Sequence, residues 1–499
     1  MKKSTKILSL VLVFVFLFSA AFLISCEKPT GEVATDEATN NSAGTNYIIK
    51  TEIKDGCIWV TYSNDPENPV NIGALGVDGA TSSEASLTYM PLANGSYGVT
   101  AGNARYLEEI IIPETYNGKA VTAILEGAFN GATNLKKITI PNSITSVGEN
   151  AFYNCGNLEY TEYDNALYLG NSENPCLILV QAKNATINRC VVNEKTVAIC
   201  DNAFYGCSDL DAVSIPNSVK SIGSYAFYGC GLIRDINLPE GITYIGAETF
   251  NNCANLRKVT IPSTVTNIGD SAFAGCASLE TVTFAKGSVL SGIANSVFNG
   301  CKKLKTITIP KNVIYIGDDK ANKNTDSVFG GCAALESVIF EDGSKLEKIG
   351  NYGFYSCKKL SSIKLPDSLT YLGHSAFTST SITSMDIPDN VTSIGKDTFL
   401  GCTKLKTASF GEKLTKIGPQ AFAGCEALNN IVIPASVKTI SKAAFNGDCT
   451  SLTSVKFNDV KNWHDIAKAE KIDEALLSDT ATAATTIKDS IYSAGIGKP

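Results

Sequence analysis

Cysteine is the residue type whose number and spacing most readily suggest chemistry in this 499-residue chain. The sequence has 16 cysteines and only two histidines. Eleven cysteines follow a phenylalanine by three residues, or by four in the last case: Cys155, Cys207, Cys230, Cys253, Cys276, Cys301, Cys332, Cys357, Cys402, Cys425 and Cys449. Cysteines can form disulfides, bind metal ions as thiolates or act as nucleophiles, and each role requires a different placement of the sulfur atoms.

The regular phase of these cysteines argues against disulfides and metal sites. On stacked strands, equivalent side chains lie about 4.8 Å apart, whereas the Cβ atoms of a disulfide lie roughly 3.5–4.5 Å apart. A zinc site needs ligands that converge, and no histidine shares the cysteine phase. We therefore expect reduced thiols that pack as small hydrophobic groups, with no metal ion and no cofactor.

The common catalytic motifs are missing from the sequence. It contains no Gly-x-Ser-x-Gly and no His-Glu-x-x-His segment. His374 and His464 are expected to be ordinary surface residues, and no carboxylate pair recurs in an apolar setting that would raise a pKa. We expect no enzyme activity. The alternative is a secreted carbohydrate-active or envelope-processing enzyme with the repeats as an accessory binding module. It would require a catalytic domain for which the chain has little room, since only residues 47–112 and 160–185 lie outside regular repeats.

The cysteines belong to a repeat of 23 residues, the distance between Phe204, Phe227, Phe250 and Phe273. Each copy follows the template Leu-x-x-Val-x-Ile-Pro-x-Ser-Val-x-x-Ile-Gly-x-x-Ala-Phe-x-Gly-Cys. Thirteen copies are anchored by a phenylalanine: Phe129, Phe152, Phe204, Phe227, Phe250, Phe273, Phe298, Phe329, Phe354, Phe377, Phe399, Phe422 and Phe445. A period of 23 lies in the range of leucine-rich repeats and far from that of helical repeats or propeller blades.

Each copy predicts one coil of a solenoid. Val259-Thr260-Ile261 alternates apolar and polar residues, which is typical of a half-buried strand, and Pro262 ends that strand. Gly269 is expected to let the backbone turn, and Ala272-Phe273 to fill the interior from a short helical turn. One coil cannot bury its own apolar residues, so the coils must stack. We predict a β-rich solenoid of the α/β type, right-handed, with about thirteen coils.

The template resembles the BspA-like branch of leucine-rich repeats, a family of bacterial and protist surface proteins. The resemblance covers about residues 87–492, with a lead-in from Leu87 to Thr122 that is similar to the family's N-terminal cap. At the other end, Leu452 to Phe457 is expected to be a final strand, followed by Trp463 and a helix near residues 480–492. Several members of the family act as adhesins, so the resemblance implies a binding role in adhesion to host or neighbouring cells.

The N-terminal residues predict export. Lys2, Lys3 and Lys6 precede an apolar run from Ile7 to Ile24, the pattern of a secretory signal. The run ends in Leu23-Ile24-Ser25-Cys26, which resembles a bacterial lipobox, so Cys26 is expected to carry lipid. The alternative is an uncleaved membrane anchor, since the run just reaches the roughly 17–25 residues that span a bilayer. The expected location is the bacterial cell surface, at the outer membrane or the outer face of the cell membrane.

The expected segments follow from these patterns. Residues 1–25 are a lipoprotein signal peptide, 26–46 a flexible tether, 47–112 an N-terminal β-rich cap, 113–457 the solenoid, and 458–499 a C-terminal cap and tail. Two spacings depart from 23. The 52 residues from Phe152 to Phe204 include an irregular insertion at 160–185 that is expected to form an extra pair of strands. The 31 residues from Phe298 to Phe329 include a polar loop at Asp318 to Thr325.

The strands offer one candidate binding surface, because the two residues beside each buried central residue point to the open face of the sheet. These residues are Lys137, Thr139, Asp235, Asn237, Lys258, Thr260, Thr281, Thr283, Thr306, Thr308, Ser362, Lys364, Ser384, Asp386, Thr407 and Ser409. Threonine is also favoured on any exposed strand, so its frequency alone does not prove binding. The tyrosines Tyr153, Tyr205, Tyr228 and Tyr355 follow their anchors on another side.

The composition limits the partners. A formal net charge of -7 excludes a general nucleic-acid binder, which would be basic. The expected partner is an extracellular protein or glycan, the expected contact with a membrane is through the N-terminal lipid, and the chain is expected to be a monomer. Because the copies are nearly identical, binding is expected to use an extended surface and not a single pocket.

Overall fold

The computed structural model describes residues 48–54, 57–62, 65–74, 86–317, 327–441, 443–445, 449–452 and 454–458. Two compact units are present among these residues, one that includes 48–53 and 59–71 and a larger one that includes the described residues from 72 onward. The strands β1 (Ile48–Lys54), β2 (Cys57–Tyr62) and β3 (Asp65–Ala74) form a sheet of their own, in the order β1-β2-β3. The segment 47–112 therefore contains this sheet as well as the first strands of the larger unit.

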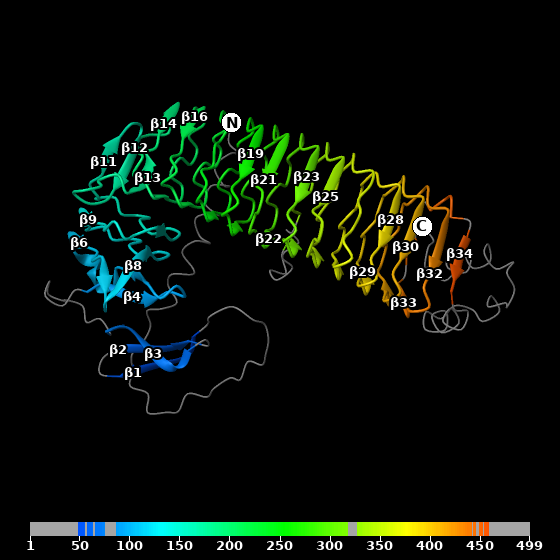
Figure 1. Ribbon diagram of the computed structural model, residues 1–499, viewed down its shortest axis with the longest axis horizontal. Helices are drawn as coiled ribbons and strands as arrows, with labels where there is room; N and C mark the ends of the chain where they lie inside the picture. The colour runs from blue at the N-terminus through cyan, green and yellow to red at the C-terminus, as the bar shows by residue number, and fades with distance from the viewer. Residues whose placement is uncertain are drawn as a thin grey trace, which may run out of the picture. The chain divides into compact units, whose positions relative to one another are not determined.

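The larger unit is a β-solenoid with a period of about 23 residues and about 15 turns. Its strands follow one another in chain order (Figure 1). The first column of strands consists of β6 (Glu109–Ile111), β9 (Lys137–Thr139), β14 (Arg189–Val191), β16 (Ala212–Ser214), β19 (Lys258–Ile261), β21 (Thr281–Phe284), β23 (Thr306–Ile309), β25 (Ser337–Phe340), β28 (Ser384–Ile387), β30 (Thr407–Phe410), β32 (Asn430–Ile433) and β34 (Ser454–Phe457). The column is divided into four sheets, and within each sheet neighbouring strands pair in parallel, as Val259 with Val282 illustrates.

A second column of mostly two-residue strands forms where the template reads Ile-Gly. It consists of β8 (Lys119–Ile124), β10 (Ser146–Val147), β13 (Ile178–Ala182), β15 (Ala198–Ile199), β17 (Ser221–Ile222), β18 (Tyr244–Ile245), β20 (Asn267–Ile268), β22 (Gly292–Ile293), β24 (Tyr315–Ile316), β26 (Lys348–Ile349), β27 (Tyr371–Leu372), β29 (Ser393–Ile394), β31 (Lys416–Ile417) and β33 (Thr439–Ile440). This column is also divided among several sheets, within which its neighbouring strands are parallel. Isoleucines pair in register from coil to coil, as Ile222, Ile245 and Ile268 do.

The solenoid begins with a small antiparallel lead-in. β4 (Thr88–Pro91) pairs with β5 (Tyr97–Thr100), and β7 (Thr115–Tyr116) pairs with β8. A 3-10 helix, Gly102–Tyr106, lies between β5 and β6. No helix in the ranges given above is long and apolar enough to cross a membrane.

The two turns beyond the expected thirteen have identifiable origins. The insertion at 160–185 folds as antiparallel strands β11 (Thr161–Tyr163), β12 (Ala166–Leu169) and β13. It also continues both columns, because Gly170 bridges to Thr139 and Ile178 pairs with Ala198. It therefore supplies a turn without an anchor phenylalanine. β34 begins the other additional turn by pairing with β32.

The segment around each anchor phenylalanine is not the expected short helical turn. It forms a third column of hydrogen bonds between coils, in which the backbone N–H of Phe204 donates to Ala226 O at 2.7 Å and that of Gly206 to Tyr228 O at 2.8 Å. The residue two positions before the phenylalanine has a positive φ, as at Tyr225 (φ 58°) and Glu248 (φ 53°). This conformation lets the backbone N–H groups of alternate residues point along the stack. Each coil is thus bonded to its neighbours on three sides.

The core is a column of phenylalanine rings. From Phe204 to Phe445 every successive pair of anchor rings is stacked, with centroid distances between 5.0 and 5.7 Å. Phe129 and Phe152 form a separate stacked pair at 5.6 Å. The insertion turn has no such ring, and the buried residues accordingly form two hydrophobic clusters, one on either side of it.

The glycine of Ile-Gly is needed for close approach and not, as expected, for turning the backbone. Gly269 does not have a positive φ, but a Cβ atom built on it would lie 2.4 Å from the backbone nitrogen of Ala247 in the preceding coil. Gly246 meets Ser224 in the same way, at 2.3 Å. A methyl group at either position would force neighbouring coils apart.

We therefore expect Gly269→Ala to destabilise the solenoid by about 1–3 kcal/mol or more, the usual cost of overpacking against a backbone that cannot move. Gly156→Ala is a matched control, because the added Cβ would have no neighbour within 4 Å and no positive φ opposes it. The control should change the free energy of unfolding by less than about 0.5 kcal/mol. Urea denaturation of both variants measures the difference, and equal effects would refute the close-approach explanation.

Candidate binding surfaces

The outward residues of the first strand column lie where the sequence analysis placed them. Fifteen of the sixteen are exposed and Thr139 is half-buried, whereas the central residues between them are buried. The parallel register brings equivalent residues side by side, pairing Thr281 with Thr306 and Thr260 with Thr283. Two rows of side chains therefore run along the stack. We call this surface the strand face.

The strand face also contains residues that the sequence analysis did not name. They are Glu109, Ile111, Arg189, Val191, Ala212, Ser214, Ser337, Ile339, Asn430 and Val432, which occupy the same two positions of their strands. Four of these are large exposed apolar side chains, led by Ile111 at 73% and Ile339 at 52%. The alternation of polar and apolar residues around each buried central residue is the sequence signal that predicts these additional strand-face residues.

Three charged residues of the strand face have side-chain partners on the same face. Lys258 Nζ lies 3.7 Å from Asp235 Oδ1, and the Ser409 hydroxyl donates to Asp386. Such exposed pairs contribute little to stability. The surface offered to a partner consists of threonine and serine hydroxyls, separate charged side chains such as Lys137 and Lys364, and a few apolar side chains. This composition favours many weak contacts over one strong contact.

The in-phase cysteines have a definite structural partner. In ten of the eleven, the thiol donates to the carbonyl oxygen of the anchor phenylalanine in the preceding coil, as in Cys253 Sγ to Phe227 O at 3.2 Å. Cys207 instead faces Asn184 O at 3.9 Å. Thr380, which replaces a cysteine, lies 3.2 Å from Cys402 Sγ.

Burial raises the pKa of these thiols, to about 12 for Cys276 and about 11 for Cys402. A protonated, hydrogen-bonded thiol is a poor nucleophile and a poor metal ligand. All fourteen cysteines from Cys155 to Cys449 are buried. Within the described ranges, no group of three or more His, Cys, Asp or Glu residues is placed to hold a metal ion.

His374 has a structural role that its position in the repeat did not suggest. Its ring Nδ1 accepts a hydrogen bond from the backbone N–H of Lys396 at 3.0 Å, and the backbone N–H of His374 donates to Asn351 Oδ1 at 2.8 Å. The ring therefore bridges consecutive coils. Several other sequence predictions lie outside the described residues: Cys26 with segments 1–25 and 26–46, the loop Asp318 to Thr325, His464 and the helix near 480–492.

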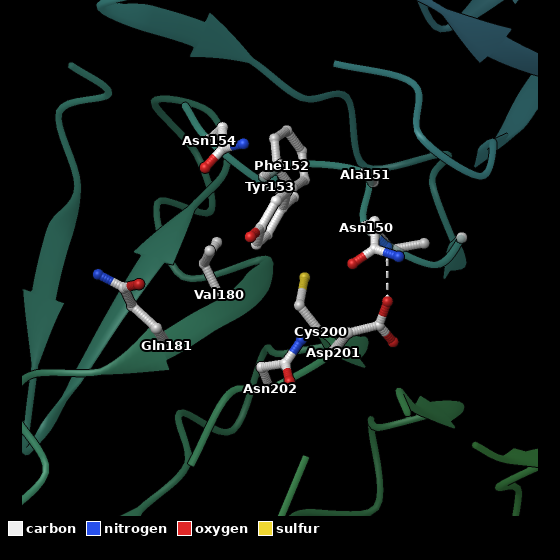
Figure 2. A pocket seen from close by; sticks show the side chains of 12 residues that line it. Asn150, Ala151, Phe152, Tyr153, Asn154, Val180, Gln181, Cys200, Asp201 and Asn202 are labelled. Carbon is white, nitrogen blue, oxygen red and sulfur yellow. Dashed lines mark hydrogen bonds between the residues drawn. The ribbon is translucent and has the colours of Figure 1, made fainter. Parts of the chain in front are cut away.

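A cavity of about 390 Å³ opens beside the insertion turn, lined by Val147, Gly148, Asn150, Ala151, Phe152, Tyr153, Asn154, Val180, Gln181, Cys200, Asp201 and Asn202. Figure 2 shows Phe152 and Tyr153 on one side of it and Cys200, Asp201 and Asn202 opposite. We call it the seam cavity. No sequence pattern indicated it, because it depends on how the insertion turn stacks between two regular coils.

Asp201 fixes one wall of the seam cavity. Its carboxylate accepts hydrogen bonds from the backbone N–H of Asn150 at 2.6 Å and of Ser224 at 2.7 Å, and so ties together coils on both sides of the insertion. Burial raises the pKa of Asp201 to about 6, with smaller contributions from Glu149 and Glu126, although the two N–H donors act in the opposite direction.

A second hollow of about 260 Å³ adjoins the first and shares Asn150, Asp201 and Asn202 with it. It is further lined by Glu149, Tyr205, Ser224 and Tyr225. Tyr205 is stacked on Tyr228 with a centroid distance of 5.0 Å and is 52% exposed. Two of the four tyrosines that the sequence places on another side of the coil, Tyr153 and Tyr205, therefore line these two hollows.

Comparison with known proteins gives one family. The BspA type leucine-rich repeat region matches residues 102–173, 197–325 and 322–453, in six copies. A comparison with curated proteins gave no match.

Solved structures similar to this chain include three bacterial proteins. A leucine-rich cell surface protein from Faecalibacterium prausnitzii is 25% identical, with 78% of this chain and 97% of that chain covered and a TM-score of 0.35. A leucine-rich repeat protein from Bacteroides ovatus is 24% identical, with 77% and 91% covered and a TM-score of 0.37. The pneumococcal vaccine antigen PcpA is 17% identical, with 89% and 96% covered and a TM-score of 0.39.

Proposed function

This chain belongs to the BspA-type leucine-rich repeat family, and from that premise we propose that it is a bacterial cell-surface protein that mediates adhesion through its strand face. Its partner is an extracellular protein or glycan on a host or neighbouring cell. The family consists of surface proteins and includes adhesins, which supports this role over that of an enzyme.

The observation that carries the proposal is the pair of side-chain rows on the strand face. Residues such as Thr283 and Thr308 are exposed and repeat along a stack of parallel strands. A regular array of hydroxyl and small apolar groups can make many equivalent contacts to an extended partner, and the affinity then grows with the number of coils that take part. Catalysis would instead need one convergent set of groups.

A screen of the purified exported part of the chain against matrix proteins, mucin and glycans tests the proposal. For any partner found, the double variant Thr283→Arg, Thr308→Arg should weaken binding at least tenfold, because it places bulky charges in the middle of the strand face. Asn267→Arg with Thr439→Arg is the matched control: it adds the same charge at exposed positions of the second column. Equal loss in both double variants would contradict a strand-face contact.

Anchoring at the surface is part of the same proposal. Leu23-Ile24-Ser25-Cys26 supports lipid attachment at Cys26, and the two acyl chains of a diacylglycerol suffice for stable anchoring where one would be marginal. Cys26→Ala should move the protein from the detergent phase to the aqueous phase on phase partitioning. A processed variant that partitions like the wild type would refute lipid attachment at this residue.

A further inference from the structure

The seam cavity exists because the insertion turn interrupts the phenylalanine column. Ala182 N donates to Ala203 O at 2.6 Å, the same bond that Phe204 N makes to Ala226 O in a regular coil. Ala182 therefore stands at the anchor position, where other coils carry an aromatic ring. As a result Phe152 stacks only on Phe129 and is 9% exposed, whereas Phe204 and the next anchors are fully buried. The apolar wall of the cavity is thus the edge of the core, where Phe152 keeps a small exposed area.

The rim of the cavity is rich in side-chain amides. Asn150, Asn154, Gln181 and Asn202 are all exposed and line it. In the part of the chain that the structure describes, none of these four side-chain amides hydrogen-bonds to the protein. Each amide offers donors and an acceptor, the combination that matches a hydroxyl group. The rim is therefore suited to a ligand that carries many hydroxyls.

Tyrosine rings extend the same surface. Tyr153, which is 56% exposed, lies at the seam cavity, and Tyr205 lies at the adjoining hollow. Tyr205 is held in place by stacking on Tyr228, and Tyr225 by donating its hydroxyl to Glu248 at 2.9 Å. Rigid tyrosines combine a flat apolar face with a polar edge, and so can pack against the C–H face of a sugar ring while bonding to its hydroxyls.

The charges at the site argue against an ionic ligand. Neither hollow is lined by lysine or arginine, so phosphate, sulfate or uronate groups would find no counter-charge. The carboxylates are already engaged, since Asp201 accepts two backbone N–H groups and Glu149 accepts the Ser224 hydroxyl. A cationic side chain would have to compete with these bonds.

We propose that the seam cavity and the adjoining hollow form a binding site for a neutral oligosaccharide. One sugar unit lies against Phe152 and Tyr153, bonded to the rim amides, and the next lies on Tyr205. The larger hollow falls in the range of about 300–1,000 Å³ that is usual for small-ligand sites. The site consists of other residues than the strand face and does not depend on a strand-face partner.

Isothermal titration of the full chain with neutral hexasaccharides of glucose, mannose, xylose and N-acetylglucosamine tests this inference. At least one should bind, and Tyr205→Ala and Asn202→Ala should each weaken it tenfold or more. Tyr355→Ala is the matched control, because Tyr355 is also exposed and follows its anchor phenylalanine but does not line either hollow. Circular dichroism confirms that these surface variants fold.

The other outcomes would overturn the inference. They are the absence of binding to every neutral hexasaccharide, binding of hexalysine or oligogalacturonate alone, and equal affinity in Tyr205→Ala and Tyr355→Ala. Loss of saccharide binding in the double variant Thr283→Arg, Thr308→Arg would assign the saccharide to the strand face. In contrast, failure of that double variant to affect an adhesion partner would count against the proposed function and leave the seam site standing.

Discussion

Raising the pH from about 9 to 12 is expected to unfold the repeat region in a steep transition. An exposed thiol ionises near pH 9, but burial raises the pKa of Cys332 to about 12 and that of Cys402 to about 11. Between these limits the folded state retains protons that the unfolded state has lost, so the free energy of unfolding falls as the pH rises. The loss is about 1.4 kcal/mol per pH unit for each such thiol.

The cooperativity of the solenoid multiplies this loss. Adjacent coils share one core, so several thiols are exposed together when a group of coils opens. Four coils would lose about 5–6 kcal/mol per pH unit, which is a large part of the stability of an ordinary domain. Far-UV circular dichroism and thiolate absorbance, followed as a function of pH, should change together. Stability should be fully retained below pH 9, where the thiols are protonated in both states.

A variant with four consecutive cysteines changed to alanine separates the thiols from other groups that ionise in alkali. In Cys253→Ala, Cys276→Ala, Cys301→Ala and Cys332→Ala combined, the midpoint should move to higher pH and the slope should become shallower. Tyrosine and lysine ionisation is the same in both proteins. An unchanged midpoint and slope would mean that buried thiols do not control the transition.

The second large effect is expected for Phe250→Ala, which should lower the free energy of unfolding by about 3–5 kcal/mol. The ring is fully buried and stacks at 5.2 Å on both Phe227 and Phe273. Its removal weakens two coil interfaces at once, and each coil depends on its neighbours for burial. Urea denaturation should show the loss, and hydrogen exchange should show that it is concentrated in the coils beside residue 250.

Cys253→Ala, in the same coil, serves as the comparison variant. It should lower the free energy of unfolding by only about 1 kcal/mol. The variant loses the thiol bond to Phe227 O, but that carbonyl still accepts the backbone N–H of Cys230 at 3.1 Å. A loss as large as that of Phe250→Ala would show that the thiol column, and not the ring column, supports the stack.

Much of the solenoid follows from the order of residues. The 23-residue spacing of the phenylalanines predicts the ring column, and the alternation around Val259 predicts both the strand and the residues on its open face. These features have strong sequence signals because burial requires particular side chains at fixed spacings. The same signal extends to the strand-face residues that were not named, such as Ile339.

The features that were not predicted depend on the backbone of the neighbouring coil. In twelve of the thirteen anchored coils the residue two positions before the phenylalanine has a positive φ. This position is filled by residues as different as Tyr225, Glu248 and Gln420, so no residue type marks it. The close approach at Gly269 and the thiol bond of Cys253 likewise involve atoms one coil away. The seam cavity is the extreme case, because it results from Ala182 occupying an anchor position that is recognised only through its hydrogen bond.

The three columns of hydrogen bonds between coils have a mechanical consequence. All three lie between neighbouring coils, so tension applied at the end of the stack loads the bonds of one interface before those of the next. The protein should then lengthen by the release of single coils, each freeing about 23 residues or roughly 80 Å of extended chain. A molecule held to a cell at one end and to a partner at the other would yield in small steps under strain, while the remaining coils keep their contacts.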